Sequence, residues 1–313
     1  MKTLKIGDLL AKVPIVQGGM GVGISLSGLA SAVANAGGVG VISTAGLGVI
    51  YNKISKDLNE ASIHGLREEL RKAREKSKGI IGVNIMVALT NFADMVKTSI
   101  EEKADIIFAG AGLPLNLPSF LKEGSTTKLA PIVSSARALK VICRRWIGEY
   151  GYVPDAVVVE GPKAGGHLGY SHEQLNDPAY ALENVVPEVV EAAREIGEKN
   201  GKHIPVIAGG GIYTGEDIVK FMALGADGVQ MGTRFVATDE CDASETFKQS
   251  YVDAKREDIE IIQSPVGMPG RAIRNSFLDK VKAGLKQPKV CPFNCIKTCD
   301  VVNSPYCIML ALF

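Results

Sequence analysis

The sequence lacks an excess of charge of either sign. Its 35 Lys and Arg residues nearly balance its 34 Asp and Glu residues, so the formal net charge is +1. A strongly basic surface attracts nucleic acids and anionic membranes, and this balance provides no such field. We therefore expect neither nucleic acid nor a membrane as a partner.

A long uninterrupted apolar run is also lacking. Residues 1–8 alternate charged and apolar side chains and have no signal-peptide core. Residues 13–52 contain no charge, but ten of them are glycine, whereas a spanning helix needs ~20 predominantly apolar residues. A buried strand–loop–helix–strand unit explains this stretch better, because parallel strands are buried on both faces. We expect a cytoplasmic protein.

Short apolar runs rich in β-branched residues alternate with amphipathic patterns along most of the 313 residues. The runs that we interpret as strands are 14–17, 38–43, 80–84, 105–109, 130–133, 156–160, 205–208 and 228–231. The helical patterns between them cover 26–35, 66–76, 91–102, 135–149, 188–199 and 215–224. Such alternation indicates βαβ units and a parallel sheet. Eight units predict an α/β fold of the (β/α)8 TIM-barrel type, which takes roughly 250 residues, with an open doubly wound sheet as the alternative.

The pattern changes after the eighth strand. Residues 240–256 and 276–284 have helical patterns, 264–274 look like a loop with Gly and Pro, and the last residues are rich in cysteine. We expect the barrel over residues 1–236 and a small helical region over 237–284 that serves as a lid or binds substrate. A Cys-rich metal-binding tail is expected over 285–313.

Glycines stand at the ends of the seventh and eighth strands. In such barrels the active site lies at the carboxyl ends of the strands, and a phosphate site often follows strands seven and eight. The residues at these two ends are Gly209, Gly210, Gly211, Met231, Gly232 and Thr233. Glycine lets the backbone approach a phosphate closely, and a helix starting near Thr214 would add its positive N-terminal end. We expect a phosphate site here; the alternative is that these glycines only form tight turns.

The chain lacks a dinucleotide fingerprint, because the glycines after strand one do not have the G-x-G-x-x-G spacing. Gly18, Gly19 and Met20 stand there instead. A glycine run lets the backbone lie flat against a planar ring. Asn84, at the end of strand three, can bond the edge of such a ring through its side-chain amide. The two strand ends therefore predict a site for a flat ring at the barrel mouth.

The sixth strand runs from Glu160 into a glycine-rich loop that ends in Gly166 and His167. Histidine suits proton transfer near neutral pH. Because this loop brings His167 to the barrel mouth, we predict that it is the catalytic acid or base. The other three histidines lack such a position, and we interpret them as surface or structural residues.

Four of the six cysteines lie close together near the C-terminal end, at Cys291, Cys295, Cys299 and Cys307. In a cytosolic protein such a group indicates a metal before a disulfide. Four thiolates within seventeen residues can bind a [4Fe-4S] cluster or Zn. The spacing is neither that of common ferredoxins nor that of zinc ribbons, so both metals stay open, with free or partly oxidised thiols as a third interpretation.

Together these motifs resemble those of the nitronate monooxygenase (2-nitropropane dioxygenase) superfamily of FMN enzymes. That superfamily includes flavin-dependent enoyl-acyl-carrier-protein reductases and NADH:quinone reductases. The shared segments are 17–20, 82–84, 164–167, 209–211 and 230–235. More similar still is the decanoyl-acyl-carrier-protein dehydrogenase/isomerase branch, which has a [4Fe-4S] tail and segments similar to 17–25, 110–114, 131–146, 154–167 and 264–273.

The resemblance implies FMN as the cofactor and His167 as the acid/base. It implies that the loops at 209–211 and 232–233 hold the FMN phosphate. The residues implied to lie around the flavin are Gly18, Gly19, Met20, Asn84, Ser134, Glu160, Gly166 and Met231. For the four tail cysteines it favours a [4Fe-4S] cluster over Zn.

The implied activity is redox chemistry on acyl thioesters, as a dehydrogenase/isomerase or an enoyl reductase, with hydride transfer at flavin N5. Alternatives from the same superfamily are oxidation of alkyl nitronates with oxygen and NAD(P)H-dependent reduction of quinones. An alternative of another class is a protein that only carries flavin or a cluster. The expected partners are a small-molecule or acyl-carrier-bound thioester and an electron-acceptor protein, and the expected assembly is a homodimer.

Overall fold

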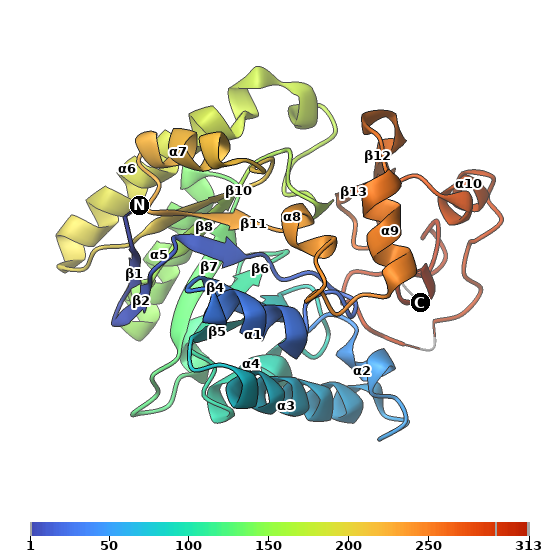
Figure 1. The fold of residues 1–313 in the computed structure, drawn as a ribbon, viewed down its shortest axis with the longest axis horizontal. Coiled ribbons are helices and arrows are strands. Elements are labelled where there is room, and N and C mark those ends of the chain that lie inside the picture. The colour runs from blue at the N-terminus through green and yellow to red at the C-terminus, as the bar shows by residue number, and fades with distance from the viewer. Residues whose placement is uncertain (1, 292, 312–313) are drawn as a thin grey trace.

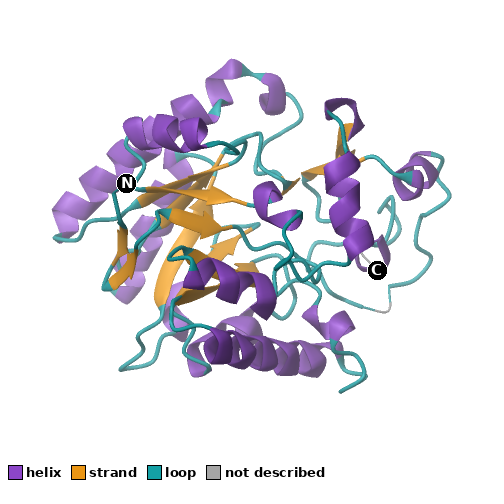
Figure 2. Ribbon diagram, in the orientation of Figure 1, coloured by secondary structure: helices purple, strands orange, loops and turns teal. Residues whose placement is uncertain are grey.

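The structure is a computed structural model that describes residues 2–291 and 293–311. A closed barrel of parallel strands lies at its centre, with helices around it (Figures 1 and 2). The barrel strands are β3 (Ile15–Gln17), β4 (Val39–Ser43), β5 (Ile80–Met86), β6 (Ile106–Gly110), β7 (Lys128–Val133), β8 (Val157–Glu160), β10 (Val206–Gly209) and β11 (Gly228–Met231). Pairing of β3 with β11 closes the sheet. The predicted (β/α)8 barrel is confirmed, and the open sheet is wrong.

Helices cover the outside of the barrel. They are α1 (Ser27–Asn35), α2 (Leu47–Ile50), α3 (Leu58–Lys76), α4 (Phe92–Glu101), α5 (Ala136–Tyr150), α6 (Leu182–Asn200), α7 (Gly215–Ala223) and α8 (Thr233–Val236), with 3-10 turns η1 (Leu117–Phe120), η2 (Gln174–Asn176) and η3 (Pro178–Tyr180). α3 begins earlier than predicted because the Asp57 side chain caps its first turn. α6 also begins earlier, since Pro187 lies inside the helix rather than before it. Among the described residues, none of the helices has both the length and the apolar content that crossing a membrane requires.

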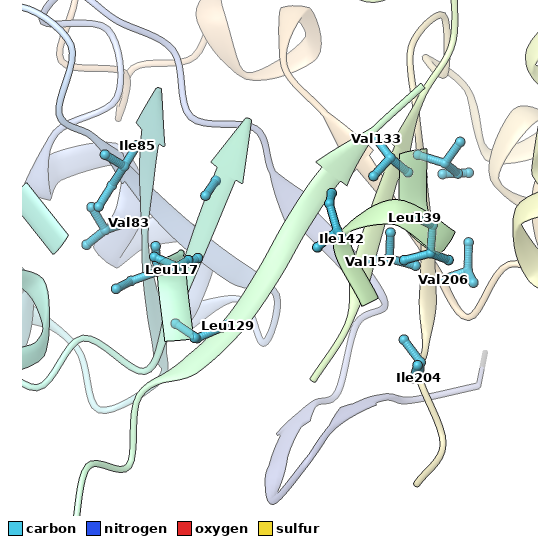
Figure 3. Packing of buried hydrophobic residues seen from close by; sticks show 14 of the residues in the cluster. Val83, Ile85, Leu117, Leu129, Val133, Leu139, Ile142, Val157, Ile204 and Val206 are labelled. Atoms are coloured by element: carbon cyan, nitrogen blue, oxygen red, sulfur yellow. The ribbon is translucent and has the colours of Figure 1, made fainter. Parts of the chain in front are cut away.

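Apolar side chains fill the inside of the barrel and the layer around it. The antiparallel hairpin of β1 (Leu4–Ile6) and β2 (Leu9–Ala11) shares one buried cluster with Val16 and Ile207 of the barrel strands. A Cβ at Gly228, the first residue of β11, would lie 3.1 Å from the Leu4 side chain, so this hairpin covers the amino end of the barrel. A second cluster lies between strands and helices (Figure 3). The packed frame leaves the carboxyl ends of the strands for a site.

The segment after α8 contains more strand than we predicted. It forms α9 (Glu245–Asp253), η4 (Arg256–Asp258), β12 (Ile259–Gln263), β13 (Pro269–Ile273), α10 (Ser276–Lys282) and α11 (Ile308–Ala311). β12 and β13 form an antiparallel hairpin, and β13 also pairs with β9 (Gly166–His167). The prediction of a plain loop over 264–274 was therefore wrong. Figure 1 shows these elements gathered at one end of the barrel, near the C-terminus.

Candidate active site

The loop after β3 is fixed by Gln17, whose side chain is fully buried. Its Oε1 atom accepts a hydrogen bond from the backbone N–H of Val41 at 2.9 Å, and its Nε2 atom donates to the Gly18 carbonyl at 2.6 Å. The same amide donates to the Ser25 hydroxyl, which accepts from the backbone N–H of Met20 at 3.0 Å. The predicted flavin-facing loop is thus held rigidly by a residue that we did not predict.

Gly19 and Asn84 lie against each other at the mouth. A Cβ at Gly19 would lie 2.3 Å from the Asn84 Cβ, so any side chain larger than that of glycine would collide there. The Asn84 carbonyl accepts hydrogen bonds from the backbone N–H and the hydroxyl of Thr44, each at 3.1 Å. The ends of the first and third strands therefore meet, and bare backbone lies next to a polar amide.

The loop after β10 lies against the loop after β8. Gly210 and Gly211 have φ angles of 104° and 81°, which side chains disfavour. A Cβ at Gly210 would lie 3.0 Å from the backbone nitrogen of Ala164, and one at Gly211 would lie 2.9 Å from the Lys163 Cβ. Both glycines border a cavity of about 370 Å³ that Asp217 also lines. These close approaches explain the glycines without excluding a phosphate next to them.

The strand ends of β3 and β11 also touch. The backbone N–H of Gly18 donates to the Met231 carbonyl at 2.8 Å, and a Cβ at Gly232 would lie 3.4 Å from the Met20 sulfur. Gly232 precedes α8, whose first residue is Thr233. The structure thus brings the predicted ring-facing loop and one of the two predicted phosphate loops to one place.

The helix expected near Thr214 is present, but its N-terminal end is already capped. The Asp217 carboxylate accepts hydrogen bonds from the backbone N–H groups of Tyr213 and Thr214, each at 2.9 Å. The Thr214 hydroxyl in turn accepts from the backbone N–H of Asp217. This capping box satisfies the backbone N–H groups of Tyr213, Thr214 and Asp217, and the contribution of α7 to a phosphate site stays a prediction.

His167 lies in the short strand β9, which pairs with β13 rather than with the barrel. Its Nε2 atom is 2.7 Å from the Ser264 hydroxyl oxygen, and burial lowers the pKa of the imidazole. A lowered pKa keeps the ring neutral at physiological pH. This is the state in which a ring nitrogen can take part in proton exchange.

Arg271 of β13 holds the loop that carries His167. Its Nη1 atom donates to the carbonyl oxygens of Pro162 at 2.9 Å and Ala164 at 2.7 Å. The segment after the barrel therefore positions the candidate acid/base from outside. We missed the roles of Ser264 and Arg271 because we interpreted 264–274 as a loop, although its similarity to one branch of the superfamily was a signal.

Glu160 ends β8 and points toward Gln230. The Gln230 side-chain amide donates to its carboxyl oxygen at 2.9 Å, and burial raises the pKa of Glu160 to about 7. The Gln230 side chain also lies close to two glycines. A Cβ at Gly18 would be 3.4 Å from it, and a Cβ at Gly209 would be 3.3 Å from it. Gln230 thus lies between the glycine loops of the first and seventh barrel strands, and the carboxyl that it binds exchanges a proton near neutral pH.

Ser134 follows β7 and lies at the same mouth. A Cβ at Gly169 would lie 3.2 Å from its hydroxyl oxygen. The Tyr170 hydroxyl donates to the Glu160 carbonyl at 2.8 Å and is 3.1 Å from the Ser134 carbonyl. Tyr170, which the sequence did not single out, therefore ties the ends of the fifth and sixth barrel strands together.

The Cys-rich tail is docked on the barrel, but its thiols do not converge. Cys291 is exposed and Cys295, Cys299 and Cys307 are half-buried. Burial and the neighbouring Cys291 and Cys307 raise the pKa of Cys295 to about 11. In residues 2–291 and 293–311, no group of three or more His, Cys, Asp or Glu side chains has the arrangement of a metal site. The four tail thiols lie near one another, but as placed they do not surround a single point as the ligands of one metal centre would.

The mouth fits FMN. Gly19, Gly210 and Gly232 lie close to neighbouring parts of the chain, so the mouth presents backbone rather than side chains at the strand ends where such barrels hold a ring and a phosphate. A Cβ at Gly165 or Gly166 would meet no described atom within 4 Å, so space remains next to His167. A parallel barrel with these glycines, His167 and Glu160 at its mouth has the groups that redox chemistry with a bound cofactor uses.

Comparison with known proteins agrees with such chemistry. The nitronate monooxygenase family model matches residues 2–302. The chain belongs to this family of FMN-dependent oxidoreductases.

Curated relatives carry two kinds of name. A Mycobacterium tuberculosis protein named (3aS,4S,5R,7aS)-5-hydroxy-7a-methyl-1-oxo-octahydro-1H-indene-4-carboxyl-CoA dehydrogenase is 28% identical over 87% of this chain. The match spans 66% of that protein, slightly under two thirds of its length. A probable nitronate monooxygenase of Staphylococcus saprophyticus is 28% identical over 90% of this chain and 81% of that protein.

Solved structures of similar fold include FabK from Thermotoga maritima. It superposes with a TM-score of 0.67 and 32% identity, over 87% of this chain and 75% of that chain. A nitroalkane oxidase from Streptomyces ansochromogenes superposes with a TM-score of 0.68 over 86% of this chain and 79% of that chain. Its 24% identity supports the fold alone.

Proposed function

We propose that this protein is an FMN-dependent oxidoreductase of acyl thioesters, either a dehydrogenase/isomerase or an enoyl reductase. The observation that carries this proposal is the half-buried His167, whose pKa is lowered by burial, at the same mouth as the glycine-lined strand ends. Chemistry beside a thioester carbonyl needs a group that exchanges a proton close to a hydride carrier. The relative named as a carboxyl-CoA dehydrogenase supports a thioester substrate.

When bound, FMN supplies hydride transfer at its N5 atom. The residues that we propose to hold it are Gly209, Gly210, Gly211, Gly232 and Thr233 at the phosphate, and Gly18, Gly19, Met20, Asn84, Ser134, Glu160, Gly166 and Met231 around the ring. The close approach of Gly19 to Asn84 supports the ring position, because it brings backbone and a side-chain amide together. The contact of Gly232 with Met20 supports a phosphate next to the ring-facing loop.

His167 would exchange a proton with the carbon beside the thioester carbonyl. Ser264 engages Nε2, so the exchange would use Nδ1, the ring nitrogen that Ser264 leaves free. Arg271 keeps the loop of His167 in place, and β13 pairs with the short strand that carries His167. A second proton transfer by the same ring would shift a double bond and give the isomerase activity.

Anaerobic absorption spectroscopy with coenzyme A and acyl-carrier thioesters tests this proposal. A dehydrogenase would bleach its oxidised flavin with a saturated thioester, and an enoyl reductase would reoxidise its reduced flavin with an enoyl thioester. His167→Ala should abolish both reactions, and the exposed His172 provides the matched control His172→Ala. If neither thioester changes the flavin spectrum in either redox state, the proposal is wrong.

Nitronate oxidation is the second candidate, and the relative named as a probable nitronate monooxygenase favours it. With a neutral nitroalkane, His167 would remove the proton from the carbon next to the nitro group and so produce the nitronate; a nitronate supplied as such needs no proton removal. Oxygen uptake with alkyl nitronates at a rate well above thioester turnover would establish this activity instead. If oxygen uptake with nitronates is no faster than thioester turnover, nitronate oxidation is only a side reaction of this protein.

We also infer that the tail cysteines bind a [4Fe-4S] cluster rather than Zn. The four neighbouring thiols suit either metal, and the preference for a cluster comes from the resemblance to the dehydrogenase/isomerase branch with its [4Fe-4S] tail. The side chains as placed do not converge on one centre, so we derive no reaction step from a cluster. Anaerobic purification with iron, sulfide and zinc analysis decides the matter. About four iron and four sulfide per chain would support it, and zinc alone or no metal would refute it.

A further inference from the structure

The segment from the end of α10 to the tail cysteines differs in charge from the rest of the chain. Residues 280–299 include five lysines and no acidic residue. Removing these five leaves 30 basic residues against 34 acidic ones, so the rest of the chain is formally negative. A local field of one sign attracts a partner of the opposite sign even where the whole protein is nearly neutral.

The same segment exposes large apolar side chains. Of those that the structure describes, Val290, Val302 and Leu285 are among the most exposed, at 76%, 74% and 73%. The Gln287 side-chain amide donates to the Val302 carbonyl at 2.6 Å, so Val302 lies beside the segment that carries the other two. Apolar side chains gathered on a surface and rimmed by polar groups are typical of a protein interaction site. We define the basic patch as Lys280, Leu285, Lys286, Lys289, Val290 and Val302.

α10 gives the basic patch a fixed base. The Phe277 ring packs edge-to-face against Tyr306 with centroids 5.7 Å apart, and Leu278 is buried. The Asn275 side chain caps the start of the helix by accepting from the backbone N–H of Leu278 at 3.0 Å. The surface that follows is therefore presented by an anchored element.

The acidic residues that flank the basic patch in sequence have partners of their own. Asp279 of α10 binds Arg274 at 3.1 Å. The Asp300 carboxylate accepts hydrogen bonds from the backbone N–H groups of Val302 and Asn303. The three lysines of the basic patch are exposed, so their charges are available to a partner.

The basic patch lies within reach of the candidate active site. Lys282, the last residue of α10, binds Glu260 of β12, and β12 pairs with β13. Gly270 of β13 lies opposite His167 of β9. Neighbouring strands are ~4.8 Å apart, so β12 lies about 10 Å from the strand of His167.

This distance suits the arm of a carrier protein. A phosphopantetheine arm has about thirteen bonds between phosphorus and sulfur, and it spans roughly 15 Å at the rise per bond of an extended peptide chain. A carrier held by the basic patch would therefore bring its thioester to His167. A thioester on such an arm is also one of the substrates expected from the proposed function.

We propose that the basic patch docks an acidic carrier protein that presents the acyl thioester on its prosthetic arm. Its lysines pair with carboxylates of the carrier, while Leu285 and Val290 contact apolar side chains between those carboxylates. The proposal rests on the function proposed above, because it names the form in which the thioester arrives. Docking raises the effective concentration of the thioester at the mouth, so a carrier-bound thioester is a better substrate than a short one.

Calorimetry with a holo acyl carrier protein and the flavin-loaded enzyme tests docking without turnover. Lys280→Glu combined with Lys286→Glu should weaken binding about tenfold or more, because like charges then face each other. The matched control combines Lys97→Glu with Lys122→Glu, an equal change of net charge at exposed residues that border a hollow between α4 and the segment before β7. It should bind like the wild type. Leu285→Ser should weaken binding at unchanged net charge.

Steady-state kinetics provide a second measurement. Lys280→Glu with Lys286→Glu should lose about tenfold in kcat/KM with a carrier-bound thioester. It should keep the wild-type kcat/KM with the uncharged pantetheine thioester of the same acyl group. Equal losses with both substrates would refute docking, because the lysines would then act on the reaction itself.

Other outcomes overturn the proposal when flavin and metal content match those of the wild type. These are a wild type that does not bind the carrier and a double lysine variant that binds it normally. Lysine-dependent binding to phosphatidylserine vesicles or to an acidic ferredoxin, without carrier binding, would assign the basic patch to that partner instead. If the double variant does not fold, Leu285→Ser decides, and unchanged binding refutes docking. A flavin that no thioester changes would refute the proposed function alone, since calorimetry still measures docking.

Discussion

The contact between Gly19 and Asn84 gives the sharpest prediction about the flavin site. In Gly19→Ala the new Cβ would start 2.3 Å from the Asn84 Cβ, while ordinary carbon contacts begin near 3.5 Å. The loop cannot simply move away, because Gln17 and Ser25 hold it from below. Overpacking of this kind costs about 1–3 kcal/mol. We expect that loss in the free energy of unfolding, and we expect FMN to bind about tenfold more weakly or worse.

Urea unfolding of the flavin-free protein and titration with FMN measure the two effects. Gly165→Ala is the matched control at the same mouth, since its Cβ would meet no described atom within 4 Å. Adding Asn84→Gly to Gly19→Ala should recover part of the unfolding free energy, because it removes the colliding atom. A Gly19→Ala protein with wild-type stability and wild-type FMN affinity would refute the packing argument and with it the placement of the ring.

Three further changes follow from the site. His167→Ala should lower kcat by about 10²–10⁴-fold at unchanged flavin content, and turnover per bound flavin measures this; an unimpaired kcat would exclude the proton-transfer role. Glu160→Gln should abolish a pH dependence of stability, which urea unfolding at pH 5 and pH 8 reveals. Because the pKa of Glu160 rises from 4.5 to about 7, the folded protein keeps a proton that the unfolded chain loses, so the wild type becomes less stable as pH rises through this window. Arg271→Ala should lower kcat/KM and speed proteolysis before His167, because the Pro162 and Ala164 carbonyls lose their donor; equal proteolysis rates would contradict this.

The barrel could be predicted from sequence because its signals are local. Buried parallel strands need continuous β-branched runs, so the pattern at 80–84 identified β5 within two residues. β13 gave no such signal, since Pro269 and Gly270 are poor strand formers. Its strand structure comes from pairing with Gly166 and His167, far away in the chain. Pairing between segments so far apart in the chain leaves no local sequence pattern from which a strand can be predicted.

Some residues of the site could also be predicted from local sequence and others could not. Glycines at strand ends and His167 were predictable, because their position in the barrel follows from the strand count alone. Gln230, Ser264 and Arg271 were not, because each acts by meeting a partner from another part of the chain. The capping box at Thr214 and Asp217 was readable, since three positions separate the two residues.

Closure of the barrel has a consequence for how the protein is made. Val229 of β11 pairs with Ile15 of β3. One edge of β3, the first barrel strand, therefore has no partner strand until nearly all of the barrel has been synthesised. Such late pairing makes folding slow and leaves the nascent chain exposed to aggregation. The bond from Gly18 to Met231 forms in that same step. At the site that we propose, FMN would bind only the closed barrel, and its binding would stabilise the folded protein over the unfolded chain by mass action.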